Sequence, residues 1–361
     1  MSTTIGSGYG ILPSLIANST NIHRQLDTLT EQASTGLVSQ TYAGLGGQAS
    51  VSLDLNAQLN GLQTYQTNIG QATGAMQVAQ AAMTQIQAVA TQFVAAIPNL
   101  NGLSSTEIDS VAAQARAALQ QVAGLLNTQD AGNYVFGGQD TANPPVPNAA
   151  NILSSGFYTQ IGAAVSGLAT NGASATAAAT LAIASSNASG TSPFSAYLSR
   201  PVSAIGVQVV QTGPDSTVQT GLIASGNSVA VSTGTSTTGS YMRDLMRALA
   251  TLGSLSSSQA GASGFGALVQ DTGTSLNGVV GAMAADVGDL GNTQAGLTAA
   301  KTQLSDTATA LTGQVSSIQN VNMAQTLSNL TAIQTQLQAS YRLIGSETSL
   351  SLVNYLPATV G

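Results

Sequence analysis

Apolar residues recur at every seventh position in two long stretches of this chain. The first stretch carries Leu55, Leu62, Ile69, Met76, Met83, Ala90 and Ile97, and the second carries Val269, Leu276, Met283, Leu290, Leu297, Leu304, Leu311 and Ile318. Near the two ends, apolar residues at helical spacing include Leu15, Ile22 and Leu29, then Leu330, Leu337 and Ile344. Such rows line one face of a helix that packs along partner helices. They predict long helices that pair antiparallel, because the chain must return, and we expect these rows to form an assembly seam.

The first long helix is expected to end near Pro98, Asn101 and Gly102, which are helix-breaking residues. A second helix is predicted to begin at Ser104 and to run to about Gln129. Its start contains Ser104 and Glu107, a capping box in which each side chain satisfies a free backbone N–H. The glycine-rich segment 44–47 lacks the Gly-Lys-Ser ending of a phosphate loop, so we expect a turn between two helices.

The middle of the chain differs from both ends. Residues 147–240 contain two charged residues, Arg200 and Asp215, and are rich in Ala, Gly, Ser, Thr and Val. β-Branched residues and turn signals at 213–215 and 226–227 predict a small β-rich domain there. Segment 174–186 is compatible with either a short helix or a loop. The fold class is therefore mainly α: a long antiparallel coiled-coil bundle from the two terminal regions, with a small β-rich inserted domain.

Charge is scarce throughout the chain. Charged residues make up 6% of the 361 residues, the net charge is −7, and Lys301 is the single lysine. Nucleic-acid binding depends on clustered basic residues, and none occurs here, so that class of partner is excluded. Helices with so few charges are expected to be covered on several sides, by partner helices or neighbouring subunits. We expect no membrane span and no Sec signal at the start, which lacks a basic region followed by an apolar run.

No set of residues suggests catalysis, a cofactor or a bound metal. His23 has Arg24 and Asp27 as local neighbours and is interpreted as a surface helix residue. Asp286 and Asp289 are expected on a solvated helix face, because a calcium loop needs more oxygen ligands around a glycine turn. Arg243 and Arg247 fit either ordinary surface ion pairs or a polar contact between subunits, and the sequence leaves both open. We therefore expect a structural protein and not an enzyme.

Three segments carry a resemblance to one family. Residues 29–59, with the motif Ala33-Ser34-Thr35-Gly36 after a helix, resemble the N-terminal segment of flagellins and hook-associated protein 3. Residues 320–356 are similar to the last helix of that family. Residues 133–141, with Tyr134, Phe136 and Gly137, and the step Pro144-Pro145-Val146 resemble the hairpin and proline step of hook-associated protein 3. Segment 40–47 lacks the charged residues typical of the family, which keeps a divergent filament flagellin open.

The resemblance implies a structural subunit of the bacterial flagellum at the hook–filament junction, with filament flagellin as the alternative. A secreted coiled-coil adhesin or translocator is a further alternative. A flagellar subunit would self-assemble through its terminal helices and bind other axial proteins and an export chaperone. It would leave the cell by the flagellar type III route, which suits a chain without cysteine.

The implied domains are five. They are residues 1–40 (helix of an inner coiled coil), 41–146 (helical core ending in a β-hairpin), 147–240 (variable outer domain), 241–313 (helical core) and 314–361 (second inner helix).

Overall fold

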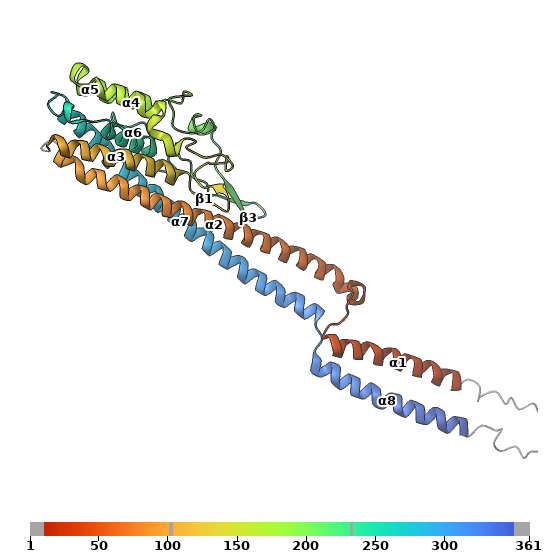
Figure 1. Ribbon diagram of the computed structural model, residues 1–361. Coiled ribbons are helices and arrows are strands. Elements are labelled where there is room, and N and C mark those ends of the chain that lie inside the picture. The colour runs from red at the N-terminus through yellow and green to blue at the C-terminus, as the bar shows by residue number, and fades with distance from the viewer. Residues whose placement is uncertain (1–10, 101–103, 232–233, 350–361) are drawn as a thin grey trace, which may run out of the picture. The chain divides into compact units, whose positions relative to one another are not determined.

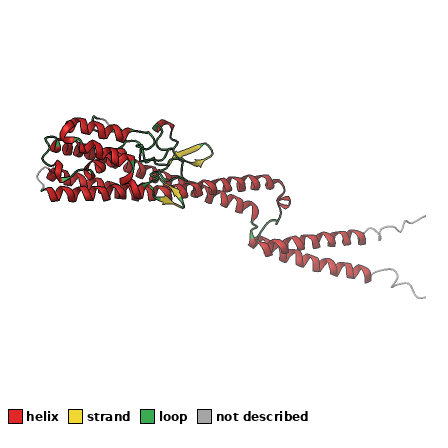
Figure 2. Cartoon of the chain, turned by 45° about the horizontal axis from the view of Figure 1, so that its top comes forward, coloured by secondary structure: helices red, strands yellow, loops and turns green. Residues whose placement is uncertain are grey.

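The computed structural model describes residues 11–100, 104–231 and 234–349 (Figure 1). Its helices are α1 (Ile11–Thr35), α2 (Ala49–Leu100), α3 (Ser105–Leu126), α4 (Gly156–Ser166), α5 (Leu168–Ser185), α6 (Tyr241–Gly253), α7 (Phe265–Gln319) and α8 (Met323–Ser349). Its strands are β1 (Gln129–Asp130), β2 (Asn133–Tyr134), β3 (Val209–Gly213) and β4 (Ser216–Gln219). Helices predominate among the described residues, and the strands form two short ribbons (Figure 2). The chain forms two compact units, Met1–Gln63 with Asp306–Gly361, and Thr64–Ser305.

The first unit contains the pair α1 and α8, which lie side by side (Figures 1 and 2). Where α1 ends, the backbone pairs with the segment that precedes α8, through an antiparallel bridge between Leu37 and Asn320. The N–H of Val38 donates to the carbonyl of Gln319 at 2.7 Å, and that of Val321 donates to Gly36 at 2.9 Å. The end of α1 is thus tied to the start of α8, so the two helices run antiparallel.

The second unit contains most of α2 and α7, which also run antiparallel. Gly70 faces Lys301, Gly291 faces Gln80, and Gly273 faces Ile97. Residue numbers therefore fall along one helix as they rise along the other. The predicted heptad residues of both helices enter the core: Ile69, Met76, Met83, Leu276 and Met283 are at most 2% exposed. The long helices predicted from the seven-residue repeat are confirmed.

The predicted starts and stops of helices are largely reproduced. The capping box of α3 is formed: the N–H of Ser104 donates to Glu107 Oε2 at 2.8 Å, and Ser104 Oγ accepts from the N–H of Glu107. Helix α3 ends at Leu126, slightly before the expected residue. Pro98 lies in the last turn of α2, whereas Asn101 and Gly102 lie outside the described residues. The glycine-rich link after α1 forms a short 3-10 helix, Tyr42–Gln48, with Gly46 at φ +56°.

The inserted region contains the ribbon β3–β4, which supplies its β structure, together with helices α4 and α5. The strands pair antiparallel, with Val209 opposite Gln219 and Gln211 opposite Thr217. The ambiguous segment 174–186 lies largely in α5, consistent with the high helix propensity of its alanines. Helix α6 packs against α3, α4 and α5, and all 13 of its residues are buried. The insert is thereby joined to the helical core.

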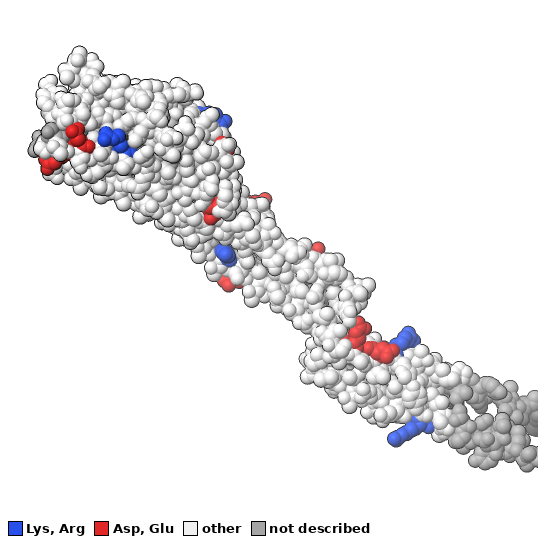
Figure 3. Space-filling model, viewed as in Figure 1, with Lys and Arg blue, Asp and Glu red and all other residues white. Residues whose placement is uncertain are grey.

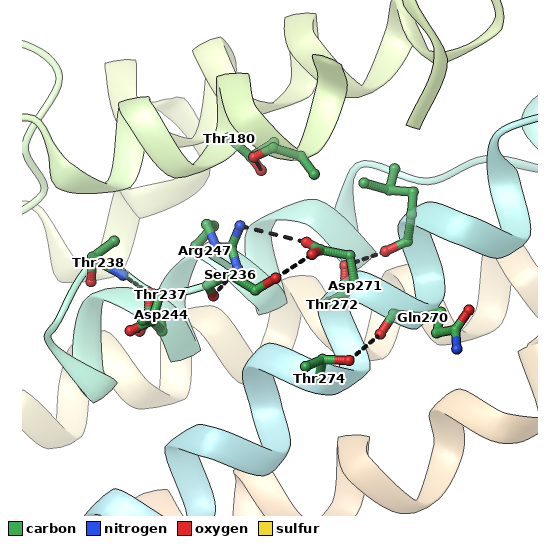
Figure 4. Close-up of polar contacts among 12 residues, drawn as sticks. Thr180, Ser236, Thr237, Thr238, Asp244, Arg247, Gln270, Asp271, Thr272 and Thr274 are labelled. Carbon is green, nitrogen blue, oxygen red and sulfur yellow. Dashed lines mark hydrogen bonds and ion pairs between the residues drawn. The ribbon is translucent and has the colours of Figure 1, made fainter. Parts of the chain in front are cut away.

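Neither interpretation of Arg243 and Arg247 as surface or intersubunit residues holds. Arg243 and Arg247 are 7% and 3% exposed, so they form neither surface pairs nor a contact between subunits. Arg243 donates to the carbonyl oxygens of Ala184 at 2.9 Å and Ser186 at 3.3 Å, where α5 ends. Arg247 points toward Asp271, with 3.8 Å between Nη1 and Oδ2 (Figure 4). Burial lowers the pKa of both guanidinium groups, and the charge of Asp244 opposes that shift.

The expected solvated face at Asp286 is also wrong, because that residue is 2% exposed. Its carboxylate accepts backbone hydrogen bonds from Ser228 at 2.7 Å and from Val229 and Ala230 at 2.9 Å. A carboxylate with three N–H donors can remain charged in the interior. Asp289, three residues further along α7, is half-buried.

Candidate assembly surfaces

The predicted seam residues point inward. Those that are buried are Ile22, Leu55, Ile69, Met76, Leu290, Leu297 and Leu337. Those that are half-buried are Leu15, Leu29, Leu62, Leu304, Leu311, Ile318, Leu330 and Ile344. The heptad rows therefore pack chiefly within the chain. Any surface between subunits must be sought on the faces that these rows leave outside.

The first unit exposes large apolar side chains, most of which lie outside the predicted rows. They are Ile16, Tyr42, Val51, Leu53, Met323, Leu327, Tyr341 and Leu343, each between 39% and 53% exposed. Leu327 and Tyr341 continue the apolar spacing of Leu330 and Leu337 in the sequence. The other residues lie beside the periodic rows, as Ile16 lies next to Leu15, and the periodicity alone did not indicate them. Groups of exposed apolar residues mark surfaces that another molecule covers.

Charged side chains hardly interrupt this surface. Figure 3 shows a small number of charged groups on a face that is otherwise uncharged. In α1 the charged residues are Arg24, Asp27 and Glu31. A solvated helix normally carries a charged outer face. Apart from these residues and Arg342 and Glu347 of α8, the α1–α8 pair offers apolar and neutral polar side chains, which can be covered without the desolvation cost of charges.

A groove of about 680 Å³ follows the α1–α8 pair. It is lined by Asn21, Arg24, Gln25, Thr28, Leu29, Asn329, Ala332 and Ile333. In the same pair, His23 is half-buried and its Nε2 hydrogen-bonds the hydroxyl of Tyr341, with ring centroids 5.8 Å apart. His23 is therefore more than a surface residue of its own helix, because its ring also contacts Tyr341 of α8.

The motif Ser34-Thr35-Gly36 ends α1. The hydroxyls of Ser34 and Thr35 both donate to the carbonyl of Glu31, at 2.9 and 2.8 Å. Gly36 follows at φ +74°, a left-handed conformation that glycine adopts without strain. The chain then turns into the bridge with Asn320. The motif therefore sets the direction in which the chain leaves the helix.

The segment around Tyr134, Phe136 and Gly137 joins the β1–β2 hairpin to the insert. The hairpin turns at Ala131 and Gly132, both at positive φ. Phe136 is 1% exposed, and its carbonyl accepts from the N–H of Ala224 at 2.9 Å. Gly137 forms an antiparallel bridge with Ile223, and a Cβ there would lie 2.2 Å from the carbonyl oxygen of Asp140. Glycine is thus required by close backbone packing.

The proline step that follows is also anchored. Asn127, which caps α3, forms a reciprocal pair with Val146: Asn127 Nδ2 donates to its carbonyl at 2.8 Å, and Asn127 Oδ1 accepts from its N–H at 2.9 Å. Val146 is fully buried. The hairpin and the proline step consequently form a packed and hydrogen-bonded connection between the helical core and the insert.

Within the described ranges, no group of three or more His, Asp or Glu side chains could hold one metal ion. None of the described helices combines the length and the apolarity that crossing a membrane requires.

The helical regions of this chain are similar to known proteins. The family model of the bacterial flagellin N-terminal helical region matches residues 12–141, and that of the C-terminal helical region matches residues 275–356. No curated protein matches the chain. The fold is similar to that of a flagellar hook-associated protein from Vibrio parahaemolyticus, with a TM-score of 0.52 and 11% identity, over 78% of this chain and 99% of that one. The two family matches together span more than half of the 361 residues, and the chain therefore belongs to the flagellin family of structural proteins of the bacterial flagellum.

Proposed function

We propose that this subunit forms the junction between hook and filament. The observation that carries the proposal is the segment Tyr134–Gly137 with its proline step, whose sequence resembles hook-associated protein 3. In the structure this segment is packed and hydrogen-bonded at both ends, to Thr141 and to Ala224. A junction protein must hold its outer region in a fixed position on the helical core, and this connection suits that requirement. The fold of the Vibrio parahaemolyticus hook-associated protein adds support.

The terminal helices would supply the assembly contacts. The seam residues hold α1 to α8 and α2 to α7, so that the apolar side chains beside them can face neighbouring subunits. Export through the flagellar type III channel, with a dedicated chaperone, fits a chain without cysteine and with few charges. The bound partners would be further copies of this chain and the adjoining axial proteins.

The exposed apolar residues of the first unit provide the test. Ile16→Asp and Leu327→Asp place a charge where we expect a neighbouring subunit, and burying an unpaired charge costs several kcal/mol, roughly 3 or more. The matched control is Asn18→Asp, at an exposed polar position of α1. We expect both apolar variants to be exported but lost from detached flagella, and the control to be retained. Equal retention of all three would show that this face is not covered.

Filament flagellin is the second candidate, because the two matching family models describe bacterial flagellin itself. The two roles differ in copy number. A filament protein forms the bulk of sheared flagella, whereas a junction protein contributes a small number of copies next to the hook. Quantifying this chain in sheared flagella, with antibody labelling of the hook-proximal end, separates the roles. Labelling along the whole length would favour flagellin.

A further inference from the structure

The inserted region carries one exposed cation and one exposed anion. Arg200 and Asp215 are the charged residues of segment 147–240, and both are exposed. Across the described ranges 11–100, 104–231 and 234–349 the structure contains one ion pair, between Arg247 and Asp271. Arg200 and Asp215 therefore have no oppositely charged partner there. On an otherwise uncharged insert, they offer complementary charges to another molecule.

Arg200 is held in place by its neighbours. Its guanidinium carbon lies 4.0 Å from the centre of the Tyr197 ring, and its Nε donates to the Tyr197 carbonyl at 3.1 Å. The Tyr197 hydroxyl in turn accepts from the N–H of Gly206 at 3.0 Å. A long side chain that is already ordered loses less entropy on binding. Arginine and tyrosine are also the residue types that most often dominate binding energy at interfaces.

Exposed apolar side chains follow Arg200 in the chain. In the described part of 64–305 the exposed large hydrophobic residues are four valines, Val202, Val209, Val229 and Val231. Val202 and Val229, 49% and 52% exposed, line a hollow of about 260 Å³ whose wall includes Ile205, Leu222 and Ile223. The second unit thus concentrates its exposed apolar side chains in the segment 202–231. The wall of the hollow also carries polar side chains and the carboxylates of Asp286 and Asp289. An exposed valine two residues from an ordered arginine, at the edge of such a hollow, combines residue types found at interfaces.

Asp215 lies at the other end of a ribbon that begins beside this hollow. Gln219 lines the hollow and pairs with Val209, whereas Asp215 occupies the turn between β3 and β4. At about 3.3 Å per residue, the run from Val209 to Gly213 places the turn roughly 13 Å along the strand from Val209. The outer face of the ribbon presents Val209 and Gln211, which are exposed. The ribbon therefore carries both an apolar contact and an anion.

We propose that the insert is a self-association surface in which Asp215 of one copy binds Arg200 of the next copy. In this arrangement the Val202 and Val229 rim packs on the exposed face of the neighbouring β3–β4 ribbon. The occupant is a second copy because the chain itself supplies the anion that Arg200 lacks and the cation that Asp215 lacks. The inference rests on self-assembly, and it holds whether the subunit lies at the junction or along the filament.

A charge exchange tests the contact. Cells carry each variant as their sole copy, and the subunit retained in detached flagella is measured against the subunit released into the medium. Arg200→Asp and Asp215→Arg should each reduce retention by roughly threefold to tenfold, since each puts like charges together. The double variant Arg200→Asp with Asp215→Arg should return to within about twofold of the wild type. Lys301→Asp, an exposed site on α7, is the control with the same charge change as Arg200→Asp.

The result that would overturn the contact is a double variant no better than the worse single variant. Single variants that behave like Lys301→Asp would overturn it as well. If the anion came from another axial protein, Arg200→Asp alone would be impaired and no rescue would occur.

A second measurement keeps the native charges. The chain has no cysteine, so Val202→Cys combined with Pro214→Cys introduces the two thiols of the test. Oxidation of detached flagella should give a ladder of linked subunits, and each single variant should stay unlinked. Absence of the ladder in assembled flagella would contradict the contact. If the ladder formed but the antibody labelled the flagellum elsewhere than at its hook-proximal end, the result would contradict the junction role alone.

Discussion

The carboxylate of Asp286 accepts a 2.7 Å hydrogen bond from the backbone N–H of Ser228, 58 residues earlier in the chain. Val229 and Ala230 donate to the same side chain, so three consecutive N–H groups converge on it. This contact holds one end of the insert on helix α7. Burial, together with the charge of Asp286, raises the pKa of the neighbouring Tyr241 well above its usual value.

Asp286→Asn should destabilise the second unit. The asparagine amide keeps one acceptor oxygen but puts an NH₂ group toward the remaining backbone donors, which stay buried and unpaired. The expected loss is about 2–3 kcal/mol of unfolding free energy, measured by denaturant titration. Asp289→Asn, on the same helix and half-buried, is the control and should cost about 0.5 kcal/mol or less. Hydrogen exchange at Ser228, Val229 and Ala230 should accelerate in the first variant; unchanged exchange would contradict this role.

Arg243→Met should also destabilise the second unit. Arg243 bonds the carbonyls at the end of α5, and its Nη2 donates to Asn187 Oδ1 at 2.7 Å. Methionine fills part of the space but leaves these acceptors without a donor, and it leaves Asp244 with Arg247 as its neighbouring cation. We expect a loss of about 3 kcal/mol. Lys301→Met removes an exposed cation and should change stability by about 0.5 kcal/mol or less. Similar unfolding midpoints for the two variants would be inconsistent with the anchoring role.

Leu297→Asp should prevent incorporation into the flagellum. Leu297 is 2% exposed on α7, so the aspartate would be buried among apolar side chains at a cost on the order of 4 kcal/mol. Ala299→Asp, two residues away and exposed, is the matched control. Swimming assays and the protein content of detached flagella provide the measurement. Normal swimming by Leu297→Asp would refute the assigned face of this helix.

The capping box of α3 predicts a pH dependence. Hydrogen bonds from the Ser104 side chain and then its backbone lower the pKa of Glu107 below its usual value of 4.5. A carboxyl group with a lowered folded-state pKa adds stability above its unfolded pKa and loses it as the pH falls through the folded pKa. Ser104→Ala should raise the Glu107 pKa toward 4.5, as followed by NMR titration.

The stability difference between Ser104→Ala and the wild type should accordingly be largest near neutral pH and shrink below about pH 4. Ser110→Ala, at an exposed serine of the same helix, should leave the Glu107 titration unchanged. A difference that persists unaltered into acid would exclude Glu107 as its source.

The long helices could be predicted because their signal is local and repeated. Residues such as Met76 and Leu290 recur at a fixed spacing, and a buried helix face needs that spacing whatever the partner is. The Ser104–Glu107 box lies within one helical turn and could be read for the same reason. The motif Ser34-Thr35-Gly36 likewise acts on its own helix end.

The charged residues could not be placed from sequence, because their partners lie far away in the chain. Nothing near Asp286 indicates that the N–H groups of residues 228–230 will reach it. The sequence around Arg243 is typical of a surface helix residue, and nothing in it indicates that α5 ends beside the Arg243 side chain. The exposed residues Ile16 and Leu343 were missed for a different reason, because an apolar residue outside a periodic row gives no sign of its exposure in the sequence.

Electron microscopy of flagella from cells that lack this protein tests the central claim most directly. A junction subunit is needed before filament can grow on the hook. The account predicts bare hooks on the cells, with flagellin released into the medium, and filaments restored when the wild-type chain is supplied. Filaments of normal length and number on the deletion cells would contradict it.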